Sequence, residues 1–138
     1  MTPRQIAIVQ DSFAKIAPIA PQAADIFYDR LFEVAPQVRA LFPDDMAAQK
    51  RNLMAMLGTA VNGLTRLDAI LPSVQDLGRR HVVYGAKAAH YPVVGSCLLY
   101  ALERGLGDSW SEELEEAWAA AYGLLSGVMI AAAEKVTE

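Results

Sequence analysis

The chain has little of several features on which common classes of protein depend. A single cysteine, Cys97, excludes an intrachain disulfide and any cysteine-based zinc or iron–sulfur site. Twelve Lys and Arg against sixteen Asp and Glu give a net charge of −4. This balance argues against nucleic acid as a partner, because phosphate binding needs a surplus of cations. Neither GxGxxG nor GxxxxGK[ST] occurs, so no phosphate-binding loop is predicted.

Targeting segments and long apolar runs are also missing. The N-terminal residues lack the unbroken apolar core of a signal peptide. The nearest approach to a membrane span, from Ala117 to Ala133, is rich in Ala and Gly and shorter than the roughly 20 apolar residues usually needed. We therefore expect a buried helix there, no membrane as a partner and a cytoplasmic location. The length of 138 residues and the 54% apolar content predict one domain over residues 1–138.

The sequence does contain helical periodicity, divided by prolines. Thr2-Pro3-Arg4-Gln5 combines a capping hydroxyl, a proline at the first helical position and a glutamine three residues after the cap. The predicted helices run from Pro3 to Pro18, from Pro21 to Pro36, from the cap at Asp44-Asp45 to Leu64, from Pro72 to Gly85, from His90 to Gly107, and onward from a cap at Ser109 or Ser111. Tight turns are expected between Pro36 and Phe42, and the stretch from Leu67 to Leu71 is ambiguous. No segment alternates with period two, so the sequence predicts an all-α protein of six to eight helices.

His81 is the residue with the clearest chemical potential. It lies in an apolar stripe, four residues after Leu77, where a histidine either satisfies one ring nitrogen in the core or binds a metal or cofactor. Tyr28 and Gln49 lie on apolar faces of two other predicted helices, where each alone would be a residue at the edge of the core. Together they would place two hydrogen-bond donors in an apolar pocket. A haem that binds a diatomic gas requires such a pocket and one nitrogen ligand.

Several segments share a pattern across essentially the whole chain. They are FYDRLF at 27–32, PQVRALF at 36–42, Gln49 with Leu53, LGRRH at 77–81, Gly85, HYPVVG at 90–95 and AWAAAYG at 117–123. With these segments the sequence resembles the globins, and more narrowly the bacterial single-domain globins and the haem domain of flavohaemoglobins. The spacing from His81 to HYPVVG and then to AWAAAYG is the specific part of this resemblance. It implies the globin fold, with its helices arranged around one haem.

The resemblance also implies roles for individual residues. His81 would bind the iron of haem b through one ring nitrogen, while the other nitrogen donates to a carbonyl on its own helix, that of Leu77. Tyr28 and Gln49 would stand on the distal side and stabilise a bound ligand. The residues implied to contact the haem are Phe42, Leu53, Leu77, Arg80 (toward a propionate), Tyr91, Val94 and Tyr122.

One position departs from the pattern of the flavohaemoglobins. Tyr91 matches the residue that hydrogen-bonds the proximal histidine there, together with a glutamate on the last helix. In this chain Ala133 occupies the place of that glutamate, and Glu134 follows one residue later. A shift of one residue turns a side chain by about 100° around a helix, so we expect Glu134 to point elsewhere. The peroxidase-like electron push on the iron is therefore in doubt for this chain.

The function implied is reversible O₂ binding with high affinity, and NO and CO are further expected ligands. The alternatives are a nitric oxide dioxygenase that uses a separate reductase, and a gas sensor. A helical module without a cofactor, docking a partner, is a further alternative. We expect a monomer or a homodimer.

Overall fold

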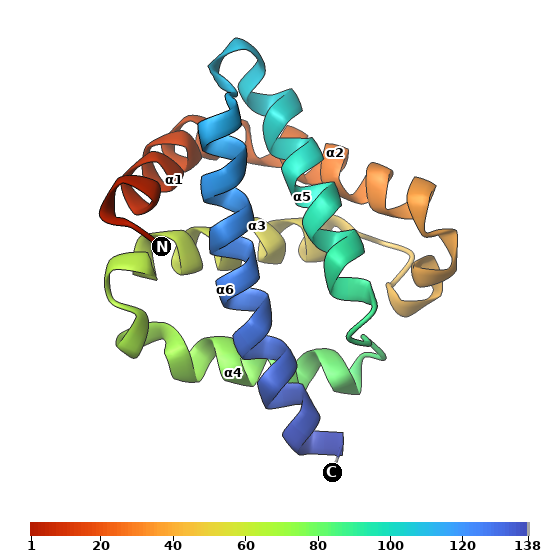
Figure 1. The fold of residues 1–138 in the computed structure, drawn as a ribbon. Coiled ribbons are helices and arrows are strands. Elements are labelled where there is room, and N and C mark those ends of the chain that lie inside the picture. The colour runs from red at the N-terminus through yellow and green to blue at the C-terminus, as the bar shows by residue number, and fades with distance from the viewer. Residues whose placement is uncertain (138) are drawn as a thin grey trace.

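The computed structural model describes residues 1–137, and in that part of the chain it consists of six α-helices and four short 3₁₀ segments without a β-strand. In chain order they are α1 (Pro3–Ile16), η1 (Ala17–Ile19), α2 (Ala20–Val34), η2 (Pro36–Leu41), α3 (Ala47–Asn62), η3 (Gly63–Thr65), α4 (Leu67–Val83), α5 (His90–Leu106), η4 (Gly107–Ser109) and α6 (Glu112–Thr137). Helix α6 runs through the middle of the molecule, and α4 crosses its C-terminal half (Figure 1). The all-α prediction is confirmed.

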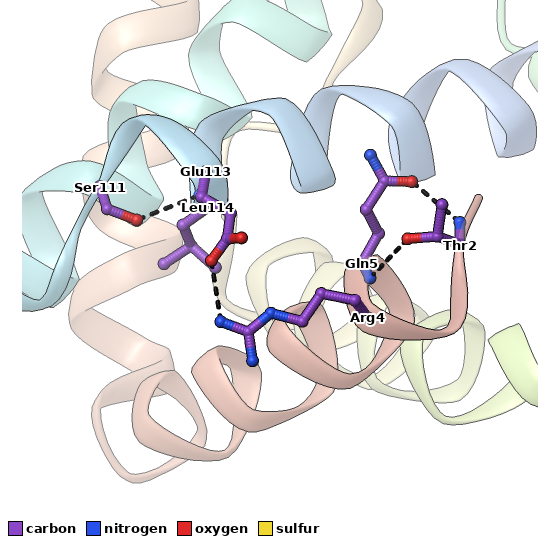
Figure 2. Close-up of polar contacts among 6 residues, drawn as sticks. All are labelled: Thr2, Arg4, Gln5, Ser111, Glu113 and Leu114. Atoms are coloured by element: carbon purple, nitrogen blue, oxygen red, sulfur yellow. Dashed lines mark hydrogen bonds and ion pairs between the residues drawn. The ribbon is translucent and has the colours of Figure 1, made fainter.

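The helix starts predicted at Thr2 and Ser111 both have the expected caps (Figure 2). Thr2 Oγ1 accepts the Gln5 amide at 3.1 Å, and Gln5 Oε1 accepts the Thr2 amide at 3.0 Å, which completes a capping box. Ser111 Oγ accepts an amide from the first turn of α6 at 3.1 Å. Arg4 and Glu113 join the first turns of α1 and α6 through an exposed ion pair of 2.9 Å. Because solvent screens exposed ion pairs, we expect the caps to stabilise these helix ends more than the Arg4–Glu113 pair does.

The core lies where α1, α2, α5 and α6 meet. Trp118 of α6 is 1% exposed, and its indole Nε1 donates to Ser12 Oγ of α1 at 2.9 Å. Ser12 Oγ in turn donates to the Val9 carbonyl at 2.9 Å, so both buried polar side chains are satisfied. This arrangement fixes α1 against the N-terminal half of α6.

The prediction that the chain restarts at Pro72 into a short helix is wrong. Helix α4 begins at Leu67 and continues through Pro72 to Val83. A proline inside a helix removes one amide, here the partner of the Asp68 carbonyl, but Asp68 is exposed and water can satisfy that carbonyl. The predicted end at Gly85 is confirmed. Gly85 has φ +94°, and the amides of Gly85 and Ala86 close a Schellman motif on the carbonyls of the last turn of α4.

One other local prediction differs from the structure in detail. The N-cap residue of α3 is Met46, although the Asp45 carboxylate still accepts the Ala47 amide at 3.0 Å. Helix α5 begins at His90, where the sequence predicts its start. His90 Nδ1 accepts the Lys87 amide at 3.0 Å and closes the turn between α4 and α5.

Helix α6 has the length and composition needed to cross a membrane over Glu112–Lys135, with a mean hydropathy of 1.3. One such helix is weak evidence, because a core helix can pass the same test. The expectation of a buried helix holds mainly for its first half, where Leu114, Trp118 and Ala121 are buried. In the second half Leu124 and Gly127 are exposed, and 22% of the most apolar window is buried.

Gly78 allows α4 to approach the backbone of α6 closely. A Cβ added to Gly78 would lie 2.4 Å from the Met129 carbonyl oxygen and 2.7 Å from its Cα. Backbone atoms cannot rotate away as a side chain does, so Gly78→Ala must push the two helices apart. We expect it to lower the free energy of unfolding by about 1–3 kcal/mol, measured by urea denaturation of the haem-loaded protein.

Gly127 of α6 provides a matched control for this prediction. Nothing lies within 4 Å of a Cβ added there. Gly127→Ala should therefore raise stability by about 0.5–1 kcal/mol through helix propensity alone. Equal effects of the two substitutions would contradict the close approach of α4 to α6.

Candidate functional site

Tyr28 of α2 and Gln49 of α3 meet in the structure. Gln49 Nε2 donates to Tyr28 Oη at 3.2 Å, and Tyr28 is 3% exposed. Because the phenol oxygen accepts this bond, the phenol proton remains available to a third group. Burial raises the pKa of Tyr28, and the hydrogen bond from Gln49 opposes this increase. The phenol is thus a protonated donor at neutral pH, polarised by the amide behind it.

An aromatic wall adjoins this pair. Phe42 meets Tyr28 edge-on with ring centroids 5.7 Å apart, and Phe32 lies 5.4 Å from Phe42. The Arg39 guanidinium lies 5.1 Å from the centre of the Phe32 ring and donates to the Pro43 carbonyl at 2.8 Å. Arg39 thus holds the segment that presents Phe42. In the sequence, the only signal of this role is an arginine three residues before Phe42.

The histidine on α4 has a defined orientation. His81 Nδ1 lies 2.8 Å from the Leu77 carbonyl oxygen, the bond that the resemblance predicts. A carbonyl can only accept, so Nδ1 carries a hydrogen, and in the neutral imidazole Nε2 then has the lone pair. The Nε2 atom has no hydrogen-bond partner among the residues that the structure describes. A ring nitrogen oriented by a backbone carbonyl in this way is suited to bind a metal.

Two tyrosines connect α5 and α6. Tyr122 Oη donates to the Tyr91 carbonyl at 2.6 Å, and the Tyr122 ring packs against Gly95, where an added Cβ would lie 2.9 Å from Cε2. The Tyr91 hydroxyl is buried and has no partner within the described part of the chain. Burial raises the pKa of both phenols, and for Tyr122 the neighbouring Tyr91 and Cys97 raise it further.

Arg80 has another partner in this structure. Its Nε lies 3.1 Å from Asp76 Oδ2, one turn earlier on α4, and both side chains are more than half exposed. The structure therefore does not place Arg80 with the residues above, and its role toward a propionate stays a prediction. On α6, Ala133 is half-buried and Glu134 is exposed, as expected from the one-residue shift.

The residues present fit a haem. Four apolar side chains that the resemblance assigns to the haem are only half-buried, so each can still contact an apolar cofactor: Phe42, Leu53, Leu77 and Val94. The unpartnered Tyr91 hydroxyl and the unbonded Nε2 of His81 indicate a missing polar partner. Within residues 1–137 no three His, Cys, Asp or Glu side chains gather to hold a bare metal ion. A single histidine suffices where a porphyrin supplies the other iron ligands.

A family model described as Globin matches residues 25–129. The chain belongs to the globin family. Leghemoglobin-1 of Lupinus luteus is 34% identical to this globin over 143 residues, covering 91% of each chain. A bacterial globin from Campylobacter jejuni has a solved structure with a TM-score of 0.87, 27% identity and 99% coverage of both chains.

Another relative has a much longer chain than this globin. The flavohemoprotein of Rhodopirellula baltica is 32% identical over 133 residues, which is 94% of this chain. The match spans 33% of the length of that relative. Membership of the globin family supports haem-based binding of gases, and the likeness to bacterial globins confirms the predicted globin fold.

The buried Tyr122 phenol should make the protein less stable in strongly alkaline solution. Its pKa in the folded state is raised above the ordinary value of 10.0, so above pH 10 the unfolded chain releases this proton first. The contribution of this phenol to the free energy of unfolding is fully present below pH 10. Above pH 10 it falls by up to about 1.4 kcal/mol per pH unit. Urea unfolding at about pH 9 and about pH 11 should show a smaller loss for Tyr122→Phe than for the wild type. Equal losses would contradict the prediction.

Proposed function

We propose that this globin binds haem b through His81 and binds O₂ reversibly with high affinity. The observation that supports the affinity is the hydrogen bond from Gln49 to Tyr28, which leaves the phenol proton available to a ligand. Bound haem would supply the ferrous iron to which O₂ binds. The Tyr28 phenol would donate a hydrogen bond to the ligand, and Gln49 fixes the phenol and strengthens it as a donor.

The apolar residues have a separate role in this proposal. Phe42, Leu53 and Val94 would contact the porphyrin and exclude water, which would protect the ferrous state from oxidation. Leu77 fixes His81 through its carbonyl, so Nε2 is the ring nitrogen that would bind the iron. Tyr122 holds the backbone of Tyr91 and thus positions the side chain whose hydroxyl is unpartnered.

Visible spectra of the reduced, haem-loaded protein test the proposal. We expect distinct oxy and carbonmonoxy spectra, and release of O₂ that is slow compared with a pocket without donors. Protein that acquires no Soret band after addition of haemin, or that is oxidised at once by O₂, would refute it. O₂ release is measured by mixing the oxy form with excess CO.

A second candidate is a nitric oxide dioxygenase that uses a separate reductase. The observation in its favour is the similarity to a flavohemoprotein of which this chain spans 33%. Its chemistry converts NO and O₂ to nitrate and leaves ferric haem, so each turnover needs one electron from a donor. Rapid mixing of the oxy protein with NO, followed by turnover with a flavin reductase, tests it. Oxidation of one equivalent with no further turnover would reject the catalytic role.

A further inference from the structure

A groove with a volume of 620 Å³ runs between α5 and α6. This volume lies within the range of about 300–1,000 Å³ that is usual for small-molecule sites. On α6 the lining extends from Glu115 to Ile130, so at 1.5 Å per residue the groove is about 20 Å long. His81 does not line it, whereas Tyr91 and Tyr122 do. We call it the α5–α6 groove.

The α5–α6 groove is narrow and open to solvent. Its volume of 620 Å³ divided by a length of about 20 Å gives a mean cross-section of about 30 Å², or roughly 5–6 Å across. A helix with its side chains, about 10–12 Å wide, is too thick to enter it. An extended alkyl chain is about 4 Å thick, the contact distance of two carbon atoms, and does fit. Ser96, Ala119 and Gly123 on its walls are small and exposed, and nothing lies within 4 Å of a Cβ added to Gly123.

The charged groups of the α5–α6 groove are confined to one end. Of its fifteen lining residues in the described part of the chain, Glu103 and Glu115 alone are charged. They lie where η4 joins α5 to α6 (Figure 1), and Trp110 directly after η4 also lines the groove. The face of an indole ring attracts organic cations. This end is therefore suited to a cationic head, and the uncharged remainder, from Leu99 toward Ile130, to an apolar chain.

The surroundings of this end are acidic as well. The stretch Glu103–Glu116 contains six Asp and Glu but one cation, Arg104. Two further arginines near it are paired with carboxylates: Arg4 with Glu113 at 2.9 Å and Arg30 with Glu33 at 2.7 Å. Lys15 lines a separate cavity together with Asp11. Lys87 and Glu134 stand just beyond the other end of the lining and offset each other in charge. The charge pattern thus favours a cation at the Trp110 end.

We propose that the α5–α6 groove binds a single-chain amphiphile with a cationic head, of the long-chain alkylammonium class. The head lies at Glu103, Glu115 and Trp110, and the tail extends between the two helices toward Ile130. Binding is non-covalent. It is separate from the proposed binding of O₂, because His81 does not line the groove.

Titration calorimetry of the haem-loaded carbonmonoxy protein with dodecyltrimethylammonium, below its micelle concentration, tests the proposal. We expect one bound amphiphile per chain and a Kd that rises as salt is added. Octyltrimethylammonium should bind about tenfold or more weakly, because its tail buries four fewer CH₂ groups. Octyl glucoside has the same tail with a neutral head and should bind more weakly than octyltrimethylammonium. The Soret band should not shift, because CO already occupies the iron.

Two pairs of variants locate the site. Gly123→Leu fills the groove and should raise Kd about tenfold or more, whereas Gly127→Leu, one turn later and outside the lining, should change it less than twofold. A Cβ at either position meets no atom within 4 Å, so both helices should form. Glu103→Lys should raise Kd about fivefold or more through charge reversal. Asp68→Lys, the same reversal at an exposed position on α4, should change Kd less than twofold.

Four results would overturn the proposal. They are the absence of saturable binding, equal losses for the variants of Gly123 and Gly127, octyl glucoside binding as tightly as octyltrimethylammonium, and a Soret shift in step with binding, which would place the amphiphile beside the haem. Gly123-dependent dimers in sedimentation would assign the groove to a second copy of the chain instead. Retention on phosphatidylcholine vesicles without binding of the single-chain probe would assign it to a membrane. Failure of the proposed function is seen separately, as missing oxy spectra.

Discussion

Replacing His81 with alanine is expected to abolish stable retention of haem. The imidazole is held by the Leu77 carbonyl at 2.8 Å and is the sole nitrogen that we propose to bind the iron. Loss of an orienting partner alone costs about 10–100-fold in metal affinity, so loss of the ligand itself should accelerate haem release on the order of 100-fold or more. The measurement is transfer of haem to apomyoglobin, followed in the Soret region.

His90→Ala is the control for this experiment, since His90 bonds the Lys87 amide in the adjoining turn. It should leave the spectrum and the haem release rate essentially unchanged. Added imidazole should slow haem release from His81→Ala but should not change the release rate of the His90 variant. If His81→Ala retained haem as the wild type does, another residue would have to bind the iron.

Replacing Tyr28 with phenylalanine is expected to accelerate O₂ release about tenfold to a hundredfold. A hydrogen bond to a charged ligand contributes about 1.5–3 kcal/mol, and the Tyr28 phenol is the buried donor with a free proton. Phenylalanine keeps the ring contacts with Phe42 and Phe27, so the fold should persist. An unchanged rate of O₂ release would show that the phenol does not face the ligand.

Gln49→Leu distinguishes an indirect from a direct effect of the amide. If Gln49 acts by polarising Tyr28, its substitution should accelerate O₂ release less than Tyr28→Phe does. When Tyr28→Phe is already present, adding Gln49→Leu should not change the O₂ release rate further, because the Gln49 amide no longer has the Tyr28 hydroxyl to bond. Independent, additive effects would instead show that Gln49 donates to the ligand itself.

Local chemistry made much of the fold predictable. Two helix ends are set by contacts with backbone groups only a few residues away: the start of α1 by Thr2 and Gln5, and the end of α4 by Gly85. A few neighbouring residues in the sequence are therefore enough to predict these ends. Pro72 is an exception, because proline is typical of a helix start and the neighbouring residues do not show that the helix already began at Leu67. Its true position inside α4 depends on the packing of that helix against α6, which lies far away in sequence.

The candidate site divides in a similar way. Tyr28, Gln49 and His81 are candidates because their polar side chains stand on apolar helical faces, but their roles toward a haem come from the resemblance to the globins. Arg39 acts through its bonds to the segment around Phe42, and Gly78 through contact with the Met129 backbone. Neither role produces a periodic pattern in the sequence, so both could be identified only from the three-dimensional structure.

The close approach of α4 to α6 has a consequence for the histidine that α4 carries. Gly78 rests against the backbone of Met129, and it lies three residues before His81 on the same helix. A change at this crossing would therefore shift the imidazole as well, although no atom of His81 is altered. The position of His81 thus depends on the seating of α4 upon the last helix as well as on the Leu77 carbonyl.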